Sequence, residues 1–339
     1  DDGAPRGRLY SGQTAVGADR GTVSFSVTHN PLPGGRCPIR KLREPDSQLD
    51  PIDQTIISQA LVATAREMGV KLVRSAYSTI LREAADGSAA ILDEKGNVVA
   101  QAELIPLQLG TIGETFRPCA LTFPPEELEE GDFYINNSPF EGGQHLPDVY
   151  IFSPIFFEGS LVGFSASVAH HLDFGGGAPG MNPNATDIYQ EGIIIPPSRY
   201  NLERDWNGGG LQRFITANIR IPELTIGDFN AQFSANAIGG QRVRQLCRKY
   251  GMDTVRAAMQ THLDYSERRM RKAITEIPDG VYAGEDALDD DGIHDEPLPI
   301  KTSVTVSGDR ISVDFAGSAP QVQLNLNCPF TSTISAVLT

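Results

Sequence analysis

The first strong pattern in the chain is a helical repeat of apolar residues that follows Asp50. From Ile56 to Val73, apolar side chains recur at helical spacing, which places them on one face of a helix. Asp50 is a favourable N-cap residue, and the Pro51 that follows it suits the first helical turn. We therefore expect a helix that begins at this pair, ends near Ser78 and buries its apolar face in the core.

Further segments are also predicted to be helical. A short one covers 111–123 and ends before Pro124, because a residue that precedes proline is biased away from helical conformation. A long helix is expected from Phe229 onward. Another long helix is expected to be N-capped by Asp253 and to reach about Ile277.

Strand patterns with a period of two residues lie between and after these helices. The runs 88–93 and 97–103 flank a short turn and predict a hairpin, and residues 132–136 predict another strand. After the last long helix, the period changes to two throughout 278–326. Asp86, just before the first of these strands, is expected to have a structural role as a capping or pairing residue, and the alternative is that it faces a functional site.

The two longest extended runs, 149–157 and 160–171, flank a glycine-containing turn and predict a β-hairpin. A two-residue loop places Asp148 opposite Ala169, and a three-residue loop places it opposite His170. Directly opposed residues share one face of the sheet, with Cβ atoms about 5 Å apart. The hairpin therefore brings a carboxylate beside a histidine pair.

A candidate metal site follows from this hairpin. Adjacent His170 and His171 point to opposite faces of a regular strand, so only one of them can face Asp148. His145 lies three residues before Asp148 on a Gly-Gly loop that can fold it back. Two histidines and one carboxylate with open positions suit Zn, Mn or Fe. The alternative is a polar structural network without metal.

Two glycine-rich loops, around 142–143 and 175–180, border these residues. Neither has the strand–GxGxxG–helix context of a dinucleotide fold, and no Gly-Lys-Ser/Thr phosphate loop occurs in the sequence. The glycines are expected to allow tight turns and close backbone approach beside the site. Asp173 and Glu191 lie in the same stretch and are further candidates.

Composition bounds the class of protein. The chain has 339 residues, of which 40% are hydrophobic and 21% charged, as in globular proteins. A net charge of −15 argues against nucleic-acid binding, which needs a basic surface. No apolar run is long enough to span a membrane, and residues 1–20 lack the apolar core of a signal peptide. The 4 dispersed cysteines are expected to be reduced thiols of a cytoplasmic protein.

These elements predict an α+β fold, a large multi-layer subunit of mixed helices and antiparallel sheets. Residues 1–46, rich in Gly, Pro, Arg and Ser, are expected to form an extended N-terminal arm. Residues 47–280 are expected to form the core domain with the metal site, and 281–339 the start of a β-rich domain. Because no stop signal precedes Thr339, we expect the polypeptide to continue beyond it.

Several motifs occur in a fixed order along the chain, namely GGQHLPDV, HHLDFGGGAPG, QEGIIIPP, NIRIPELTIGDFNAQ and VDFAGSAPQ. Together they resemble the hydantoinase B family over about 50–339. That family includes the B subunits of ATP-dependent hydantoinases and lactamases, the matching half of 5-oxoprolinase and the alpha subunits of acetone carboxylase. The resemblance implies a hetero-oligomer in which an A-type ATPase subunit uses ATP-Mg to phosphorylate the substrate, a small cyclic amide.

The resemblance also implies roles for residues of the central stretch. His145, Asp148 and His170 match the metal ligands, and a water activated there would attack the phosphorylated carbon. His171 and Glu191 are expected to move protons. Asp173 matches a further family position and is grouped with them as a catalytic candidate.

Three positions depart from the family pattern. Where the family commonly has Asn-Asp-Pro, Asp-Phe-Ser and His-Leu-Gly, this chain has Asn137-Ser138-Pro139, Asp86-Gly87-Ser88 and Gln108-Leu109-Gly110. These changes leave the metal set intact and bear on the substrate or a further ligand. Besides the amide hydrolase, two alternatives stay open: a subunit of an ATP-dependent ketone carboxylase of the acetone or acetophenone type, and a non-catalytic scaffold subunit.

Overall fold

The computed structural model describes residues 50–108 and 110–339, so the predicted N-terminal arm at 1–46 lies outside the described residues. The described chain forms two compact units. The smaller is Ser266–Val322, and the larger combines the chain up to Tyr265 with Gln323–Thr339. This division puts residues 323–339 with the core rather than with the β-rich segment.

A six-stranded antiparallel sheet forms the centre of the larger unit, in the order β2-β1-β5-β4-β3-β6. Both predicted hairpins, β1–β2 and β4–β5, are present, and the predicted strand at 132–136 is β3. The strands are β1 (Gly87–Asp93), β2 (Val98–Gln101), β3 (Asp132–Asn136), β4 (Asp148–Phe157), β5 (Ser160–His170) and β6 (Ser198–Asn201).

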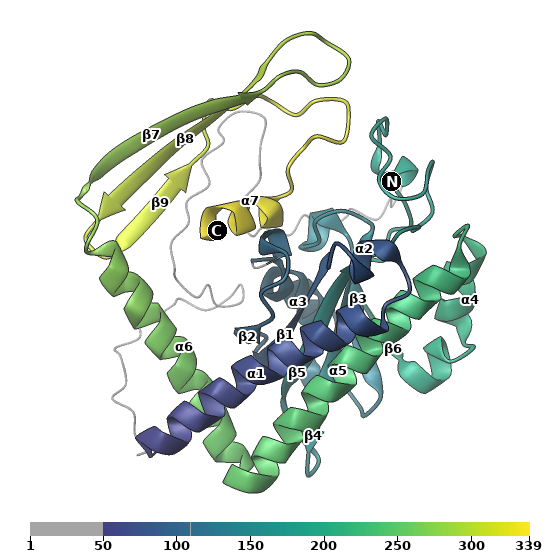
Figure 1. Cartoon of the computed structure of the whole chain (residues 1–339), viewed down its shortest axis with the longest axis vertical. Helices are drawn as coiled ribbons and strands as arrows, with labels where there is room; N and C mark the ends of the chain where they lie inside the picture. Colours follow the sequence, from purple (N-terminus) through teal and green to yellow (C-terminus); the bar gives the residue numbers. More distant parts are fainter. Residues whose placement is uncertain (1–49, 109) are drawn as a thin grey trace, which may run out of the picture. The chain divides into compact units, whose positions relative to one another are not determined.

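Helices cover both faces of this sheet. They are α1 (Pro51–Ser75), α2 (Thr79–Arg82), α3 (Thr111–Thr122), α4 (Gly210–Ala217), α5 (Pro222–Tyr250), α6 (Met252–Ile274) and α7 (Phe330–Leu338). The predicted start of α1 is confirmed, since the Asp50 side chain accepts a hydrogen bond of 2.8 Å from the Ile52 amide. In Figure 1, α1 and α5 lie side by side across the sheet.

Side-chain alternation along the strands separates two apolar layers. One face packs under α1 and α5 with residues such as Ile91 and Val149. The opposite face packs under α3, where the Phe116 ring lies 4.7 Å from the Phe164 ring, centroid to centroid. The central strands are thus buried on both sides, and polar residues at their ends belong to one layer or the other.

Two helix boundaries differ from the predictions. The helix expected from Phe229 begins at Pro222, because Pro222 supplies the first turn and the Asp173 carboxylate caps the preceding amides from a distant segment. The next helix begins at Met252, which places Asp253 in its first turn. Neither cause is visible in a local apolar period.

The smaller unit is a three-stranded antiparallel sheet with the end of α6. Its strands are β7 (Gly280–Leu288), β8 (Leu298–Ser307) and β9 (Arg310–Asp314), in the order β7-β8-β9. The predicted period-two region is confirmed as far as Asp314. A strand expected at 321–326 is wrong: no strand forms there, and Asn325 instead donates to the Asn182 carbonyl oxygen in the larger unit.

No helix within 50–108 and 110–339 is both long and apolar enough to cross a membrane. Cys119, Cys247 and Cys328 are free thiols, and the first two are buried.

Candidate functional site

The β4–β5 hairpin sets the register that the candidate site needs. Asp148, the first residue of β4, pairs directly with His170, the last residue of β5. A register shift between Ile155 and Phe156 supplies the extra residue that this pairing requires. The prediction that the hairpin brings Asp148 to the histidine pair is therefore confirmed.

His145 folds back onto this pair. The His145 Nδ1 atom lies 3.2 Å from Asp148 Oδ2, and the His145 ring lies 4.9 Å from the His170 ring, centroid to centroid. A short turn holds the arrangement, since the Asp148 amide donates to the His145 carbonyl oxygen at 3.0 Å. The structure thus brings together the three predicted metal ligands.

Glycines shape the loop that carries His145. Gly142 has φ +96°, and a Cβ there would lie 2.5 Å from the Glu114 carbonyl oxygen of α3. The buried Asn137 side chain, which precedes the loop, donates to the Leu146 carbonyl oxygen at 2.6 Å. The loop is therefore pressed against α3 and fastened beside the histidine.

Asp86 and Gln108 also belong to the cluster, although the sequence favours a structural role for Asp86 over a place in a site. Gln108 Nε2 donates to Asp86 Oδ1 at 3.4 Å, and the Asp86 carbonyl oxygen accepts from the His170 amide at 3.0 Å. Ala85 adopts a positive φ of 54°, unusual for a residue with a side chain, immediately before Asp86. The available sequence signal was the departure from the family pattern at Gln108 and at Gly87, the residue that follows Asp86.

Charge coupling connects these groups. Burial, and then the Asp148 charge, raise the pKa of Asp86 to about 6, against the opposing effect of His145. Burial alone would lower the pKa of His145, but the Asp148 carboxylate outweighs it and the pKa rises to about 9. Burial lowers the pKa of His170. Burial also raises the pKa of Glu191, which lies within electrostatic reach of His145.

The donor chemistry fits a divalent cation. Asp148 Oδ1, His170 Nδ1 and Gln108 Oε1 are buried without a hydrogen-bond partner, and buried polar atoms normally have one. However, no three His, Cys, Asp or Glu side chains in the described part of the chain are gathered closely enough to hold a metal ion as they stand. A cation would have to draw these side chains together.

His171 lies on the opposite face of the sheet from His170, as predicted. It is fully buried and stacks on Phe229 of α5 with ring centroids 4.2 Å apart. Its Nε2 atom lies 3.1 Å from Gln232 Oε1, and burial lowers its pKa to about 4. His171 is thus a neutral residue of the layer between sheet and α5.

Asp173 has partners of its own. Its Oδ1 atom accepts from Arg220 Nη1 at 3.0 Å and from the Gly175 amide at 3.2 Å. Its Oδ2 atom accepts from the amides of Arg220 and Ile221. These contacts give Asp173 a structural task at the entry to α5, and its catalytic role stays a prediction.

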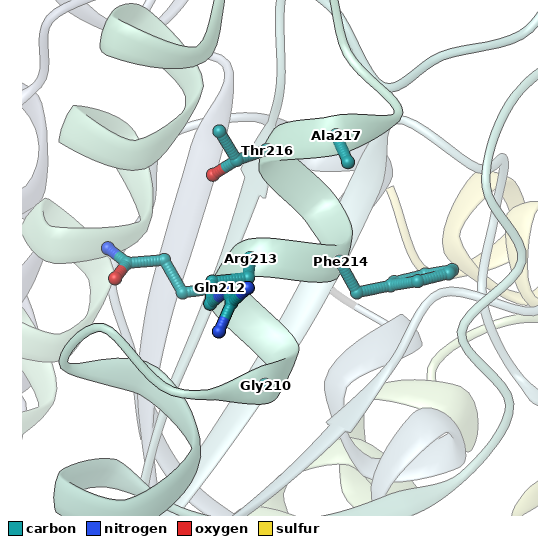
Figure 2. Close-up of a pocket in the computed structure, with 6 residues that line it drawn as sticks. All are labelled: Gly210, Gln212, Arg213, Phe214, Thr216 and Ala217. Atoms are coloured by element: carbon teal, nitrogen blue, oxygen red, sulfur yellow. The ribbon is translucent and has the colours of Figure 1, made fainter.

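A surface depression on α4 contains none of these residues. Figure 2 shows that its lining comes from α4 alone, namely Gly210, Gln212, Arg213, Phe214, Thr216 and Ala217. One helix cannot enclose a ligand, so the chemistry of the histidine and carboxylate cluster carries more weight than this depression.

Comparison with known proteins identifies the family of this chain. Residues 50–339 match the family model described as hydantoinase B/oxoprolinase. This chain belongs to the hydantoinase B/oxoprolinase family.

Two relatives extend the comparison. The chain is 35% identical to the B chain of a putative D-/L-hydantoinase from Pseudomonas sp. (strain NS671), covering 86% of this chain and 51% of the relative. It is 33% identical to the beta chain of the caprolactamase of Pseudomonas jessenii, covering 85% and 49%. The chain thus spans about half the length of these relatives.

Two solved structures have a similar fold. One is the crystal structure of the ATP-dependent caprolactamase from Pseudomonas jessenii, with a TM-score of 0.79 and 32% identity over 86% of this chain and 50% of that one. A nucleotide-free acetone carboxylase structure is similar with a TM-score of 0.75, covering 85% of this chain and 40% of that one. At 17% identity, the second likeness concerns the fold alone. The predicted combination of mixed helices and antiparallel sheets is confirmed.

Proposed function

We propose that this chain is the B-type component of an ATP-dependent amidohydrolase that opens a cyclic amide such as a hydantoin or lactam. A partner subunit of the A type would bind ATP-Mg and phosphorylate the substrate, and the two would form a hetero-oligomer. The similarity to a putative hydantoinase component and to an ATP-dependent caprolactamase supports this class of reaction. We expect the complex to act in the cytoplasm.

The observation that carries the proposal is the buried Asp148–His170 pair with His145 folded over it. Asp148 and His170 each keep one unpaired polar atom, and the two residues face each other across the β4–β5 hairpin beside the His145 ring. His145, Asp148 and His170 would hold a Zn, Mn or Fe ion, which when bound would polarise a carbonyl oxygen and lower the pKa of water.

The remaining residues of the cluster would handle the substrate and its protons. Water adds to the activated carbon, the ring C–N bond breaks as its nitrogen takes up a proton, and hydrolysis of the remaining acyl phosphate gives carboxylate and phosphate. Asp86, whose pKa is about 6, suits the proton transfers near neutral pH. Gln108 Oε1 would accept a hydrogen bond from the amide N–H. Glu191 is the second proton carrier.

The test uses the chain together with its partner subunit. His145→Ala and His170→Ala should each lower the metal content and reduce ATP-coupled ring opening by at least about 100-fold. His262→Ala, on α6 outside the cluster, is the matched control and should change neither. Full ring opening by protein without bound metal would overturn the proposal.

The carboxylase and scaffold alternatives predict different results. ATP hydrolysis that depends on bicarbonate and a ketone would identify a carboxylase. If the chain is a scaffold, the His145→Ala variant would bind the partner subunit normally. The wild-type chain would already contain no metal. The fold likeness to acetone carboxylase does not by itself favour the carboxylase, because only 17% of residues are identical.

A further inference from the structure

Helix α7 lies against the loop that carries His145. The helix and the loop belong to the same unit but are far apart in the sequence. The Thr331 hydroxyl donates to the Gly143 carbonyl oxygen at 2.9 Å. Next to it, Gln144 Nε2 donates to the Ser332 hydroxyl at 3.3 Å. Both contacts therefore fall on the two residues that directly precede His145.

The same helix contacts the loop that follows Gln108. The Gly110 amide donates to the Ser335 hydroxyl at 3.0 Å. A Cβ atom on Gly110 would lie 2.7 Å from Ile334 Cγ2, so the backbone of this loop packs directly on α7. One helix thus holds two separate loops of the candidate site.

The buried face of α7 is polar. Thr331, Ser332 and Ser335 are 3%, 7% and 0% exposed. Burying hydroxyl groups costs free energy unless each one is hydrogen-bonded. The hydroxyls have directional partners, and those partners are backbone and side-chain groups of the site loops.

We propose that α7 is a brace for the site, with Thr331 and Ser335 as positioning residues that set the places of His145 and Gln108. The loop before His145 contains two glycines, one of them at positive φ, and therefore has little conformational restriction of its own. Hydrogen bonds from outside the loop fix its course, as supporting groups around metal ligands commonly do. The inference rests on the proposed function in that His145 is taken as a metal ligand.

The first pair of variants tests the hydroxyl group of Thr331. Thr331→Val keeps the branched shape and loses the donor, whereas Thr331→Ser keeps the donor. Thr333→Val is the matched control, because the Thr333 hydroxyl bonds locally, at Pro329 and Cys328. Ser335→Ala tests the second loop separately.

Two readouts apply to the full chain. Hydrogen–deuterium exchange should become faster in peptides that cover 138–147 after Thr331→Val and in those that cover 106–112 after Ser335→Ala. Titration with Mn²⁺ and Zn²⁺ should show metal binding about fivefold weaker for Thr331→Val, the equivalent of one lost hydrogen bond. Thr331→Ser and Thr333→Val should match the wild-type chain in both measurements.

The outcomes separate this inference from the proposed function. Unchanged hydrogen–deuterium exchange in both loops would overturn the proposal that α7 is a brace. Equal metal affinity of Thr331→Val and wild type would also overturn it. Faster exchange in the control Thr333→Val would overturn it too, because it would reveal general loosening of α7. A wild-type chain that binds neither metal would contradict the proposed function, while the exchange data would still decide whether α7 restrains the two loops.

Discussion

Asp148 and Asp173 are both buried carboxylates beside a histidine-containing stretch, but they differ in their hydrogen-bond partners. Asp173 receives hydrogen bonds at both oxygens from Arg220 and nearby amides. Asp148 faces two histidines and keeps one oxygen unpaired. A buried charge costs free energy unless it is paired, so the complete set at Asp173 indicates a structural role. The incomplete set at Asp148 lies beside two histidines, and the proposed ligand site rests on this combination.

The neighbouring histidines differ in the layer of the fold to which each belongs. His170 lies on the α3 side of the sheet beside Asp148, while His171 lies on the α5 side, stacked on Phe229. One residue step along a strand therefore separates a candidate ligand from a residue of the core.

The same substitution at both aspartates gives the strongest test of this comparison. Asp148→Ala should reduce ATP-coupled ring opening by at least about 1,000-fold, because it removes a metal ligand and the partner of His145. Its free energy of unfolding should fall by about 2 kcal/mol at neutral pH, because the charge that raises the pKa of His145 to about 9 is lost. Turnover assays and chemical denaturation measure the two effects. A folded Asp148→Ala chain with near-normal turnover would remove Asp148 from the site.

Asp173→Ala should lower stability and leave turnover almost unchanged. It leaves three backbone amides without their acceptor and removes the carboxylate partner of Arg220, so the free energy of unfolding should fall by about 3 kcal/mol. Turnover per folded molecule should stay within about threefold of wild type. Denaturation curves combined with activity at low temperature would check this. A large loss of turnover without loss of stability would instead restore Asp173 as a catalytic residue.

The pH dependence of stability tests His171. Its pKa of about 4 in the folded chain lies below the ordinary value of 6.5, so the unfolded chain binds the proton more readily between these values. This contribution to stability is complete above pH 6.5 and is lost as the pH falls toward 4. Between pH 7 and pH 5 the loss should be about 2 kcal/mol. The stability of His171→Gln should depend less on pH than that of wild type by this amount, and parallel curves would show that His171 already accepts a proton in the fold.

The smallest expected loss of turnover is that of a variant at Gln108. Gln108→Leu removes a group that contacts Asp86 and has an unpaired oxygen, so turnover should fall about fivefold to tenfold while stability stays equal or rises slightly. Gln54→Leu is the matched control, because Gln54 on α1 also has an unpaired buried oxygen. Equal losses of turnover in both variants would show that the effect at position 108 is not specific to the site.

Local periodicity predicted the parts of this protein that depend on neighbours in sequence or across one hairpin. The β4–β5 hairpin and the opposite orientation of His170 and His171 follow from a period of two. The choice between Ala169 and His170 as the partner of Asp148 stayed open, because a bulge decides it. The resemblance then selected His145. The role of Asp173 was not accessible in this way, because its partner Arg220 lies 47 residues away in sequence. A sequence shows the type of a side chain but not whether a distant group already satisfies it.

The same limit explains the C-terminal segment. Alternation at 321–326 favoured a strand, but β9 pairs only with β8 among the described strands, and the segment leads back to the core. Contacts such as Thr331 to Gly143 join positions 188 residues apart. No local pattern encodes them, and for the same reason the sequence could not decide between a structural role for Asp86 and a place in the site.

Anomalous diffraction from crystals of the chain grown with Zn²⁺ or Mn²⁺ tests the central claim most directly, because it locates the ion itself. The account predicts one strong peak about 2.0–2.2 Å from side-chain atoms of His145, Asp148 and His170, and no such peak in Asp148→Ala crystals. A peak bound by other residues, or none at this cluster at saturating metal, would contradict it.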